Sequence, residues 1–211
     1  MTLAFETDGL VLKTDDLEVL AFKLDLDQDA IDEIGLCLNE DESRRAMGLR
    51  LRQDQRRFVA TRGRLRHLLA ARLEICPADV EFEYEELGKP HLSSRMRDSD
   101  LRFSVSRSAD VAVIALTNSR DVGVDIEAIL PVPEADQIAS LCLSAADYES
   151  YAAVDAEHRP KDFLERWTRL EAVAKALGCG LGQPIVWNEE DWTVTRFVPR
   201  AGYIGTVVVR N

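Results

Sequence analysis

A charged pair inside an apolar helix is the first sign of chemistry in this sequence. Residues 163–177 read FLERWTRLEAVAKAL, and at about 100° per residue the apolar side chains fill one arc of a helix. The predicted arc comprises Phe163, Leu164, Trp167, Leu170, Val173, Ala174 and Leu177. Glu171 falls inside it and Lys175 lies at its edge. Because burying an unpaired charge is costly, Glu171 should have a cation, a metal or several donors as partner. A solvated i,i+4 ion pair with Lys175 is the alternative interpretation.

Two further carboxylates stand upstream, in the segment VGVDIE. Asp125 and Glu127 are two apart on a predicted strand, so they share one face and lie within about 7 Å of each other. A solvated strand face would also explain them. Together with Glu171 they offer three hard oxygen ligands, which suit Mg²⁺ rather than zinc. Because Mg²⁺ usually completes its shell with water and phosphate oxygens, we expect a phosphate-bearing substrate.

Positive charge that could bind such a substrate is concentrated in one segment. The net charge is −12, yet residues 44–72 contain ten arginines and a single acid, Asp54. Arg45 in this segment, Lys89 in a Gly-Lys-Pro turn, and Ser106 with Arg107 after a strand are candidate phosphate contacts. Each arginine of the long helix, taken singly, is also explained as a solubilising surface residue.

The elements that must position these residues follow from periodicity and turn signals. Helices are expected at 29–38, 41–49, 52–73, 134–142, 145–153 and 161–177. Strands are expected at 17–24, 80–85, 101–106, 111–117, 121–127, 193–198 and 203–210, with 101–127 forming one antiparallel group. Each half of the chain thus has helices followed by strands, which predicts an α+β protein of two similar-sized lobes, 1–120 and 121–211. The ligand is expected in the cleft between them.

Composition narrows the class of protein. The chain has 211 residues, 46% of them hydrophobic, which is enough for a core without disulfides. Its four dispersed cysteines argue against a zinc site or a disulfide framework, and no apolar run reaches the length of a membrane span. We expect a cytoplasmic protein without membrane contact. The acidic remainder and the scarcity of aromatics in the basic segment argue against the alternative of an RNA-binding protein.

Four segments in order resemble the successive motifs of the Sfp-type 4′-phosphopantetheinyl transferases. They are ELGKPHL (86–92), RFSVSRSADVAVIAL (102–116), VGVDIE (122–127) and FLERWTRLEAVAKALGCGL (163–181). The resemblance implies a pseudo-twofold pair of α+β lobes, each with helices on a small antiparallel sheet. It also implies transfer of the phosphopantetheine arm of coenzyme A to a serine of an apo acyl or peptidyl carrier protein, with release of adenosine 3′,5′-bisphosphate. Carriers of this kind tend to be acidic, and the enzyme is expected to be a monomer.

The same resemblance assigns roles to individual residues. The metal ligands for Mg²⁺ would be Asp125, Glu127 and Glu171. The contacts to coenzyme A would be Arg45, Lys89, Ser106, Arg107 and Lys175. The catalytic set would be Glu171, Lys175 and Glu127, with either glutamate as the base that takes the proton of the carrier serine.

Three positions depart from the family pattern. Arg107 replaces a histidine, Leu170 replaces a lysine, and Cys179 replaces a frequent lysine. Arg107 can bind phosphate as a permanent cation but cannot serve as a titratable acid or base. These departures motivate a second hypothesis, a non-catalytic module that binds coenzyme A or a carrier, against which the intact acids and Lys175 argue.

Overall fold

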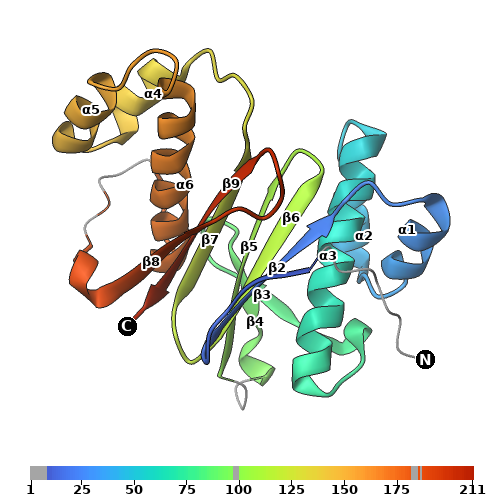
Figure 1. Cartoon of the computed structure of the whole chain (residues 1–211). Helices are drawn as coiled ribbons and strands as arrows, with labels where there is room; N and C mark the ends of the chain where they lie inside the picture. Colours follow the sequence, from blue (N-terminus) through green and yellow to red (C-terminus); the bar gives the residue numbers. More distant parts are fainter. Residues whose placement is uncertain (1–8, 97–99, 182–184, 186) are drawn as a thin grey trace.

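The computed structural model describes residues 9–96, 100–181, 185 and 187–211 (Figure 1). The helices are α1 (Gln28–Gly35), α2 (Glu40–Met47), α3 (Arg52–Leu73), α4 (Ala135–Cys142), α5 (Ala145–Ala152) and α6 (Arg159–Leu177). The strands are β1 (Gly9–Lys13), β2 (Leu17–Lys23), β3 (Phe82–Tyr84), β4 (Pro90–Leu92), β5 (Leu101–Ser108), β6 (Val111–Asn118), β7 (Val122–Ala128), β8 (Trp192–Phe197) and β9 (Tyr203–Arg210). None of the helices within these ranges is long and apolar enough to cross a membrane.

The two halves of the chain repeat one antiparallel arrangement. The first sheet has the order β1-β2-β6-β5 and the second has the order β7-β9-β8. In each half a strand is followed by helices and later by two more strands of the same sheet, the last of which lies between the other two; in the first half the short β3-β4 pair comes before these two strands. The predicted α+β fold of two lobes is therefore confirmed, and the expected boundary after residue 120 falls between β6 and β7.

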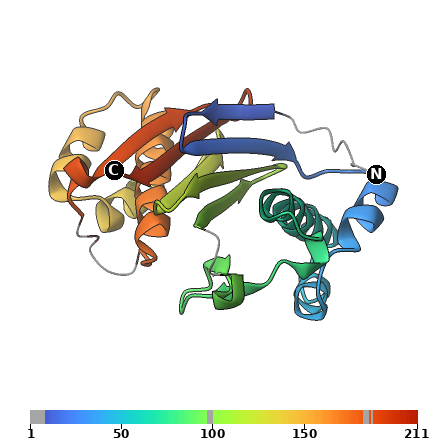
Figure 2. The same cartoon turned by 90° about the horizontal axis from the view of Figure 1, so that it is seen from below.

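The core is layered between the two long helices, as Figures 1 and 2 show. The inner faces of the two sheets pack against each other through alternate residues of β2, β6, β7 and β9, including Val19, Val113 and Val124. The outer face of the first sheet packs on α3, and that of the second packs on α6. The site predicted between the lobes must therefore lie along the edges where the sheets meet.

One expected pairing is wrong. Strand β7 does not continue an antiparallel group with β5 and β6 but pairs with β9. The reason is that β6 already has β2 on one side and β5 on the other, so it has no free edge. Strands β1 and β4 were not expected at all. Strand β4 begins at Pro90, and a proline weakens any strand signal because it cannot donate to a ladder.

Part of the basic segment is structural rather than exposed. Arg66 is only 1% exposed, and it donates to Glu42 of α2 at 2.7 Å and to the carbonyl of Val80 at 2.8 Å. The guanidinium of Arg62 lies 4.9 Å from the ring centroid of Phe82. Arg62 and Arg66, which the sequence predicts on the polar face of α3, thus hold α2 and β3 against this helix. An arginine pattern cannot distinguish these roles, because a buried guanidinium needs a distant carboxylate that the local sequence does not indicate.

Helix α6 lies unusually close to β7. A Cβ added to Gly123 would be 1.9 Å from the carbonyl oxygen of Ala172, so only glycine permits this approach. Thr168, not assigned to the apolar arc, is fully buried and its hydroxyl meets that of Thr206 at 3.0 Å. Leu177, which was assigned to the arc, is 38% exposed. The face of α6 that contacts the sheet therefore differs from the predicted arc and includes the small residues Thr168, Ala172 and Ala176. This orientation places Glu171 and Lys175 over β7.

Candidate active site

A row of serines joins the two sheets at their meeting edges. Ser104, Ser106 and Ser108 alternate along β5 and face β7. Their hydroxyls accept hydrogen bonds from the backbone N–H groups of Val124, Ile126 and Ala128, at 3.0, 3.3 and 3.0 Å. Strand β7 pairs with β9 on its other side only, so these N–H groups would otherwise lack partners. The serine row thus fixes β7 against the first lobe.

The same serines orient the predicted acids. Ser106 donates to Oδ1 of Asp125 at 2.7 Å, and Ser108 donates to Oε2 of Glu127 at 2.7 Å. Sequence reasoning assigned Ser106 to coenzyme A and gave Ser108 no role. The alternation SVSRS was the available signal for both, because it places polar side chains at every second position of a strand.

Lys175 brings the helix to this cluster. Its ammonium donates to Oδ1 of Asp125 at 2.7 Å and to the carbonyl of Val124 at 3.2 Å. Asp125 is only 4% exposed, and its Oδ2 is buried without a hydrogen-bond partner among the described residues. Burial raises the pKa of Asp125, while the Lys175 charge and the bonds from Lys175 and Ser106 lower it. Lys175 thus forms its ion pair with the strand acid.

Glu127 and Glu171 complete an acidic group on the α6 side of β7. Burial raises the pKa of each, and the charge of Asp125 raises it further. The charge of Lys175 acts in the opposite direction on both. The three predicted acids therefore lie within range of one another's charge. No group of three His, Cys, Asp or Glu side chains within the described ranges is arranged to hold a metal ion as it stands.

The remaining predicted contacts are distributed around this cluster. Lys89 is half-buried, its ammonium donates to the carbonyl of Lys175, and burial lowers its pKa. Arg107 is exposed, and strand alternation directs it to the face of β5 opposite Ser106. Arg45 is exposed on α2, with its guanidinium 5.7 Å from the ring centroid of Phe58. The structure thus joins Ser106, Lys89 and Lys175 to the acids directly or in one step, whereas Arg45 and Arg107 stand farther out.

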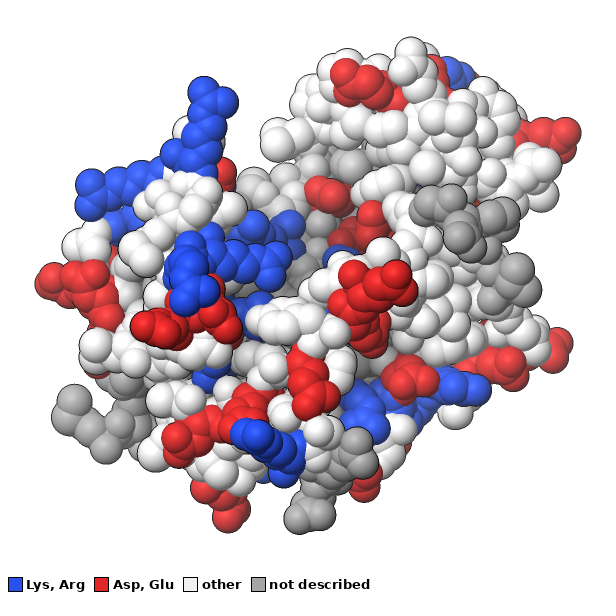
Figure 3. All heavy atoms as spheres, turned by 180° about the vertical axis from the view of Figure 1, so that it is seen from behind, with Lys and Arg blue, Asp and Glu red and all other residues white. Residues whose placement is uncertain are grey.

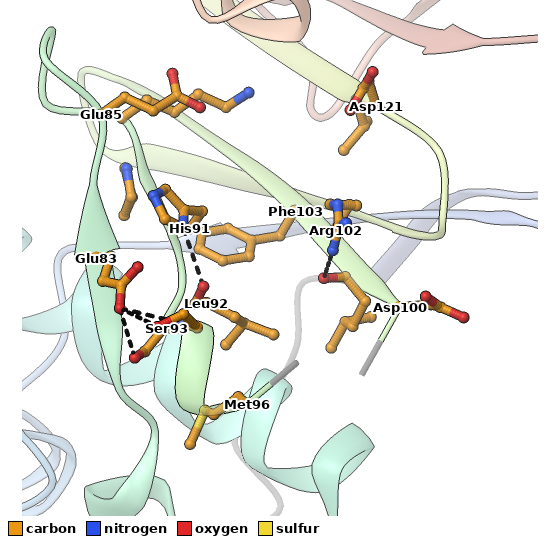
Figure 4. Close-up of a pocket in the computed structure, with 15 residues that line it drawn as sticks. Glu83, Glu85, His91, Leu92, Ser93, Met96, Asp100, Arg102, Phe103 and Asp121 are labelled. Atoms are coloured by element: carbon orange, nitrogen blue, oxygen red, sulfur yellow. Dashed lines mark hydrogen bonds between the residues drawn. The ribbon is translucent and has the colours of Figure 1, made fainter. Parts of the chain in front are cut away.

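Two adjoining cavities open beside Lys89. One of about 380 Å³ is lined by Lys89, Lys175, Phe103 and Val105 among others, with the glycine turn that ends α6. The second, of about 440 Å³, shares Glu85, Lys89, Pro90 and Phe103 with the first and continues toward Asp100 and Asp121 (Figure 4). Sequence reasoning missed Phe103 and Glu85, because without β4 there was no hairpin to place beside β5.

Figure 3 shows the surface of the molecule from behind. A hollow separates the two lobes, with Lys and Arg side chains gathered on one wall and Asp and Glu side chains on the other (Figure 3). Charge of both signs thus faces a common space. Such a space suits a ligand that carries anionic groups together with a cation bound to carboxylates.

The sequence of this chain matches known protein families and individual known proteins. The description "4'-phosphopantetheinyl transferase, N-terminal" matches residues 27–119, and "4'-phosphopantetheinyl transferase superfamily" matches residues 121–205. HetI of Nostoc sp., a 4'-phosphopantetheinyl transferase, is 32% identical over 83% of this chain and 74% of its own length. The protein slr0495 of Synechocystis sp. is 32% identical over 78% and 68%. AcpT of Escherichia coli, also a 4'-phosphopantetheinyl transferase, is 32% identical over 58% and 57%.

The chain belongs to the 4′-phosphopantetheinyl transferase superfamily. The expectation of an enzyme of this class is thereby confirmed. The family implies coenzyme A and a carrier protein as its partners.

Proposed function

We propose that this chain is an Sfp-type enzyme that transfers the 4′-phosphopantetheine arm of coenzyme A to a serine of an apo acyl or peptidyl carrier protein, with Mg²⁺ as cofactor. The observation that carries the proposal is Asp125. This buried carboxylate is held by Ser106 and Lys175 through one oxygen, while the other oxygen has no partner among the residues described. A buried acceptor left open at the meeting point of two lobes is suited to a cation.

The residues present fit Mg²⁺ by their chemistry. Asp125, Glu127 and Glu171 would hold it through carboxylate oxygens, and one or two of them suffice because water and phosphate oxygens complete the shell. When bound, the ion would supply positive charge to the diphosphate of coenzyme A. A fixed three-carboxylate cage is not required for that role. The charges of Asp125 and Glu127 act on Glu171, which places the three acids within reach of one another's charge.

The chain's own residues would do the rest by positioning and charge. Lys175 and Arg107 would offset negative charge on the diphosphate, and Lys89 and Arg45 would bind the nucleotide phosphates. The cavity beside Lys89 would receive the adenine end, because Phe103, Val105 and Pro90 give it apolar walls.

The proposed reaction is a substitution at phosphorus. The carrier serine oxygen forms a bond to the phosphorus that bears the pantetheine, and the bond from that phosphorus to the nucleotide-side oxygen breaks. Adenosine 3′,5′-bisphosphate leaves with the electron pair. The serine proton goes to Glu171 or Glu127, directly or through water, and the geometry favours neither glutamate.

The test is to incubate the protein with coenzyme A, Mg²⁺ and a panel of apo-carriers from fatty-acid, polyketide and peptide synthesis. We expect the mass of at least one carrier to rise by one phosphopantetheine group. An unchanged mass for every carrier would contradict the proposal and favour a non-catalytic module. We also propose that the enzyme is a monomer, since a single chain supplies every residue named, and that it acts in the cytoplasm. Light scattering in solution would test the monomeric state.

A further inference from the structure

Strand β5 ends in a strained turn directly after one of the serines that hold the acids. Ser108 is the last residue of β5, and Ala109 after it has a φ of 47°. In this left-handed region a Cβ crowds the following carbonyl oxygen, so a residue other than glycine is strained there. Such a conformation persists only where surrounding contacts hold it. The turn between β5 and β6 therefore needs contacts that fix its shape.

Asp110, the next residue, makes contacts to both lobes. Its carbonyl accepts from the N–H of Leu24 at 2.8 Å, which ties the turn to the first lobe. Its carboxylate accepts from the hydroxyl of Tyr203 and, at 3.1 Å, from the guanidinium of Arg200. These two donors belong to the second lobe, where the turn before β9 lies beside the turn between β5 and β6 (Figure 1). The bond between Asp110 and Tyr203 is here called the clamp.

The two donors to this carboxylate are not equivalent. Tyr203 is 7% exposed and belongs to the core between the two sheets, so its hydroxyl stands at a fixed place. The side chain of Arg200 is 43% exposed, and an ion pair with such an exposed cation contributes little. The tyrosine is therefore the donor that fixes the turn.

The clamp is in register with Glu127. Tyr203 pairs with Ala128 in the ladder between β7 and β9. Ser108, two residues before Asp110, donates to Oε2 of Glu127 at 2.7 Å and accepts from the N–H of Ala128 at 3.0 Å. Two neighbouring links thus join the end of β5 to the end of β7, one through the serine and one through the clamp.

Both strands stop at this point. Ser108 is the last residue of β5, and Ala128 is the last residue of β7. The ends of elements open more readily than their centres, so a serine bond at two strand ends is easily lost unless the ends are tied. The bond from the N–H of Val124 to Ser104, at 3.0 Å, lies inside both strands and does not need such a tie.

We propose that Asp110 and Tyr203 are positioning residues for the transfer reaction: their clamp keeps Ser108 against the end of β7 and so holds the carboxylate of Glu127 in its working orientation. This rests on the proposed function, in which Glu127 binds Mg²⁺ or takes the proton of the carrier serine. Without the clamp the serine bond opens and the carboxylate rotates. Only the fraction of molecules with the carboxylate in place then reacts, so turnover falls by that fraction.

The first test measures the clamp without turnover. Tyr203→Phe removes the hydroxyl alone, and NMR measures amide hydrogen exchange on the full chain. We expect the exchange rate of Ala128, relative to that of Val124, to rise about tenfold, because the clamp controls local opening at the strand ends. Loss of overall stability alone cannot raise this ratio, since it accelerates Val124 at least as much. A ratio that is unchanged or lower would overturn the proposal.

Arg200→Ala is the control for this measurement. It removes the exposed donor to the same carboxylate and leaves the bond from Tyr203 in place. We expect the ratio of the two exchange rates to stay at the value of the parent. An increase as large as that in Tyr203→Phe would show that the tyrosine has no special role.

The second test uses the proposed reaction. At saturating coenzyme A, Mg²⁺ and carrier, we expect Tyr203→Phe and Asp110→Ala each to lower kcat about tenfold. Asp110→Asn should restore most of the loss, because its amide oxygen still accepts from the tyrosine. The matched control is Glu18→Ala, since Glu18 also accepts from two side chains, Lys13 and Arg72, but within the first lobe. This variant should keep the kcat of the parent.

A pair of variants separates positioning from stability. Ser108→Ala removes the link through which the clamp acts on Glu127, and thermal unfolding would verify that the variant folds. Adding Tyr203→Phe to it should then lower kcat by less than about twofold more, while stability falls by as much as it does in the parent. If Tyr203→Phe lowers kcat by the same factor with and without Ser108, the clamp acts on stability alone and the proposal is wrong.

These readouts distinguish failure of the clamp from failure of the proposed function. Amide exchange needs neither coenzyme A nor a carrier. A parent that modifies no carrier would remove the proposed function, and with it the catalytic role of the clamp, whatever the exchange rates show. Transfer by the parent, with kcat and the exchange ratio unchanged in Tyr203→Phe, would remove the clamp alone.

Discussion

At the scale of single residues, the site depends on placing carboxylates where water does not reach them freely. Asp125 tolerates burial because Lys175 and Ser106 act on one of its oxygens. Glu171 has no such hydrogen bonds in the described structure, and burial with the neighbouring acids raises its pKa. A cation bound together with coenzyme A would give the open oxygen of Asp125 a partner. Its charge would also lower the pKa of Glu171.

Replacing Glu171 tests this directly. Glu171→Gln keeps the size of the side chain and removes its charge, so we expect kcat/KM to fall about a hundredfold or more with thermal stability unchanged. The matched control is Glu165→Gln on the same helix, whose carboxylate pairs outward with Arg196 and Lys161. Equal rates for the two variants would remove Glu171 from the catalytic set.

The serine row makes a separate prediction about stability. Ser106→Ala leaves the N–H of Ile126 unpaired and takes one donor from Asp125, so we expect a loss of about 1–3 kcal/mol in the free energy of unfolding. Urea unfolding would measure it. Ser140→Ala, at an exposed serine that bonds only to its own helix, should change the free energy by less than about 0.5 kcal/mol. Similar values for the two would refute the structural role of Ser106.

At the scale of elements, the close approach of α6 to β7 sets the geometry of the site. Gly123→Ala would place a methyl group 1.9 Å from the carbonyl oxygen of Ala172, so helix and strand must separate. We expect a loss of about 3 kcal/mol in unfolding free energy, together with weaker transfer. Gly48→Ala is the control, because its added carbon meets nothing nearer than 3.5 Å and its φ is −74°. A Gly123 variant as stable as the parent would show that stability does not depend on the close approach of α6 to β7.

Sequence patterns predicted most elements because their periodicity is strong, and helices α2, α3, α4 and α5 lie within a residue or two of the expected ranges. What failed depended on long-range contacts. The partner of β7 was decided by the absence of a free edge on β6, and the inward turn of Arg66 by Glu42 in another helix. The acids were predicted from VGVDIE and the helix, but the serines that hold two of them required the meeting of β5 and β7.

At the scale of the whole molecule, the two lobes are also joined at the turn between β5 and β6. Tyr203 at the start of β9 donates its hydroxyl to Oδ1 of Asp110 in the β5–β6 turn, and Arg200 donates to Oδ2 at 3.1 Å. The bond from Tyr203 is the largest cause that lowers the pKa of Asp110 below its usual value of 3.8. A carboxylate with a lowered folded-state pKa stabilises the fold above its unfolded pKa.

The pH dependence follows from that sign. The contribution of Asp110 is fully present well above pH 3.8 and is lost as the pH falls through its lower folded-state pKa. We expect Tyr203→Phe to reduce unfolding free energy at neutral pH, and this deficit to shrink as the pH is lowered below about 4. Tyr148→Phe, at a tyrosine that is 37% exposed, is the control and should show no such convergence. A deficit that stays constant with pH would assign the effect of Tyr203 to packing.

The most direct measurement is the anomalous diffraction of a crystal grown with coenzyme A and Mn²⁺ in place of Mg²⁺. The predicted result is one strong peak that contacts the carboxylates of Asp125 and Glu171 and the diphosphate, with the adenine in the cavity beside Lys89. A manganese ion bound elsewhere, or a diphosphate that does not border Asp125, would contradict the proposed site.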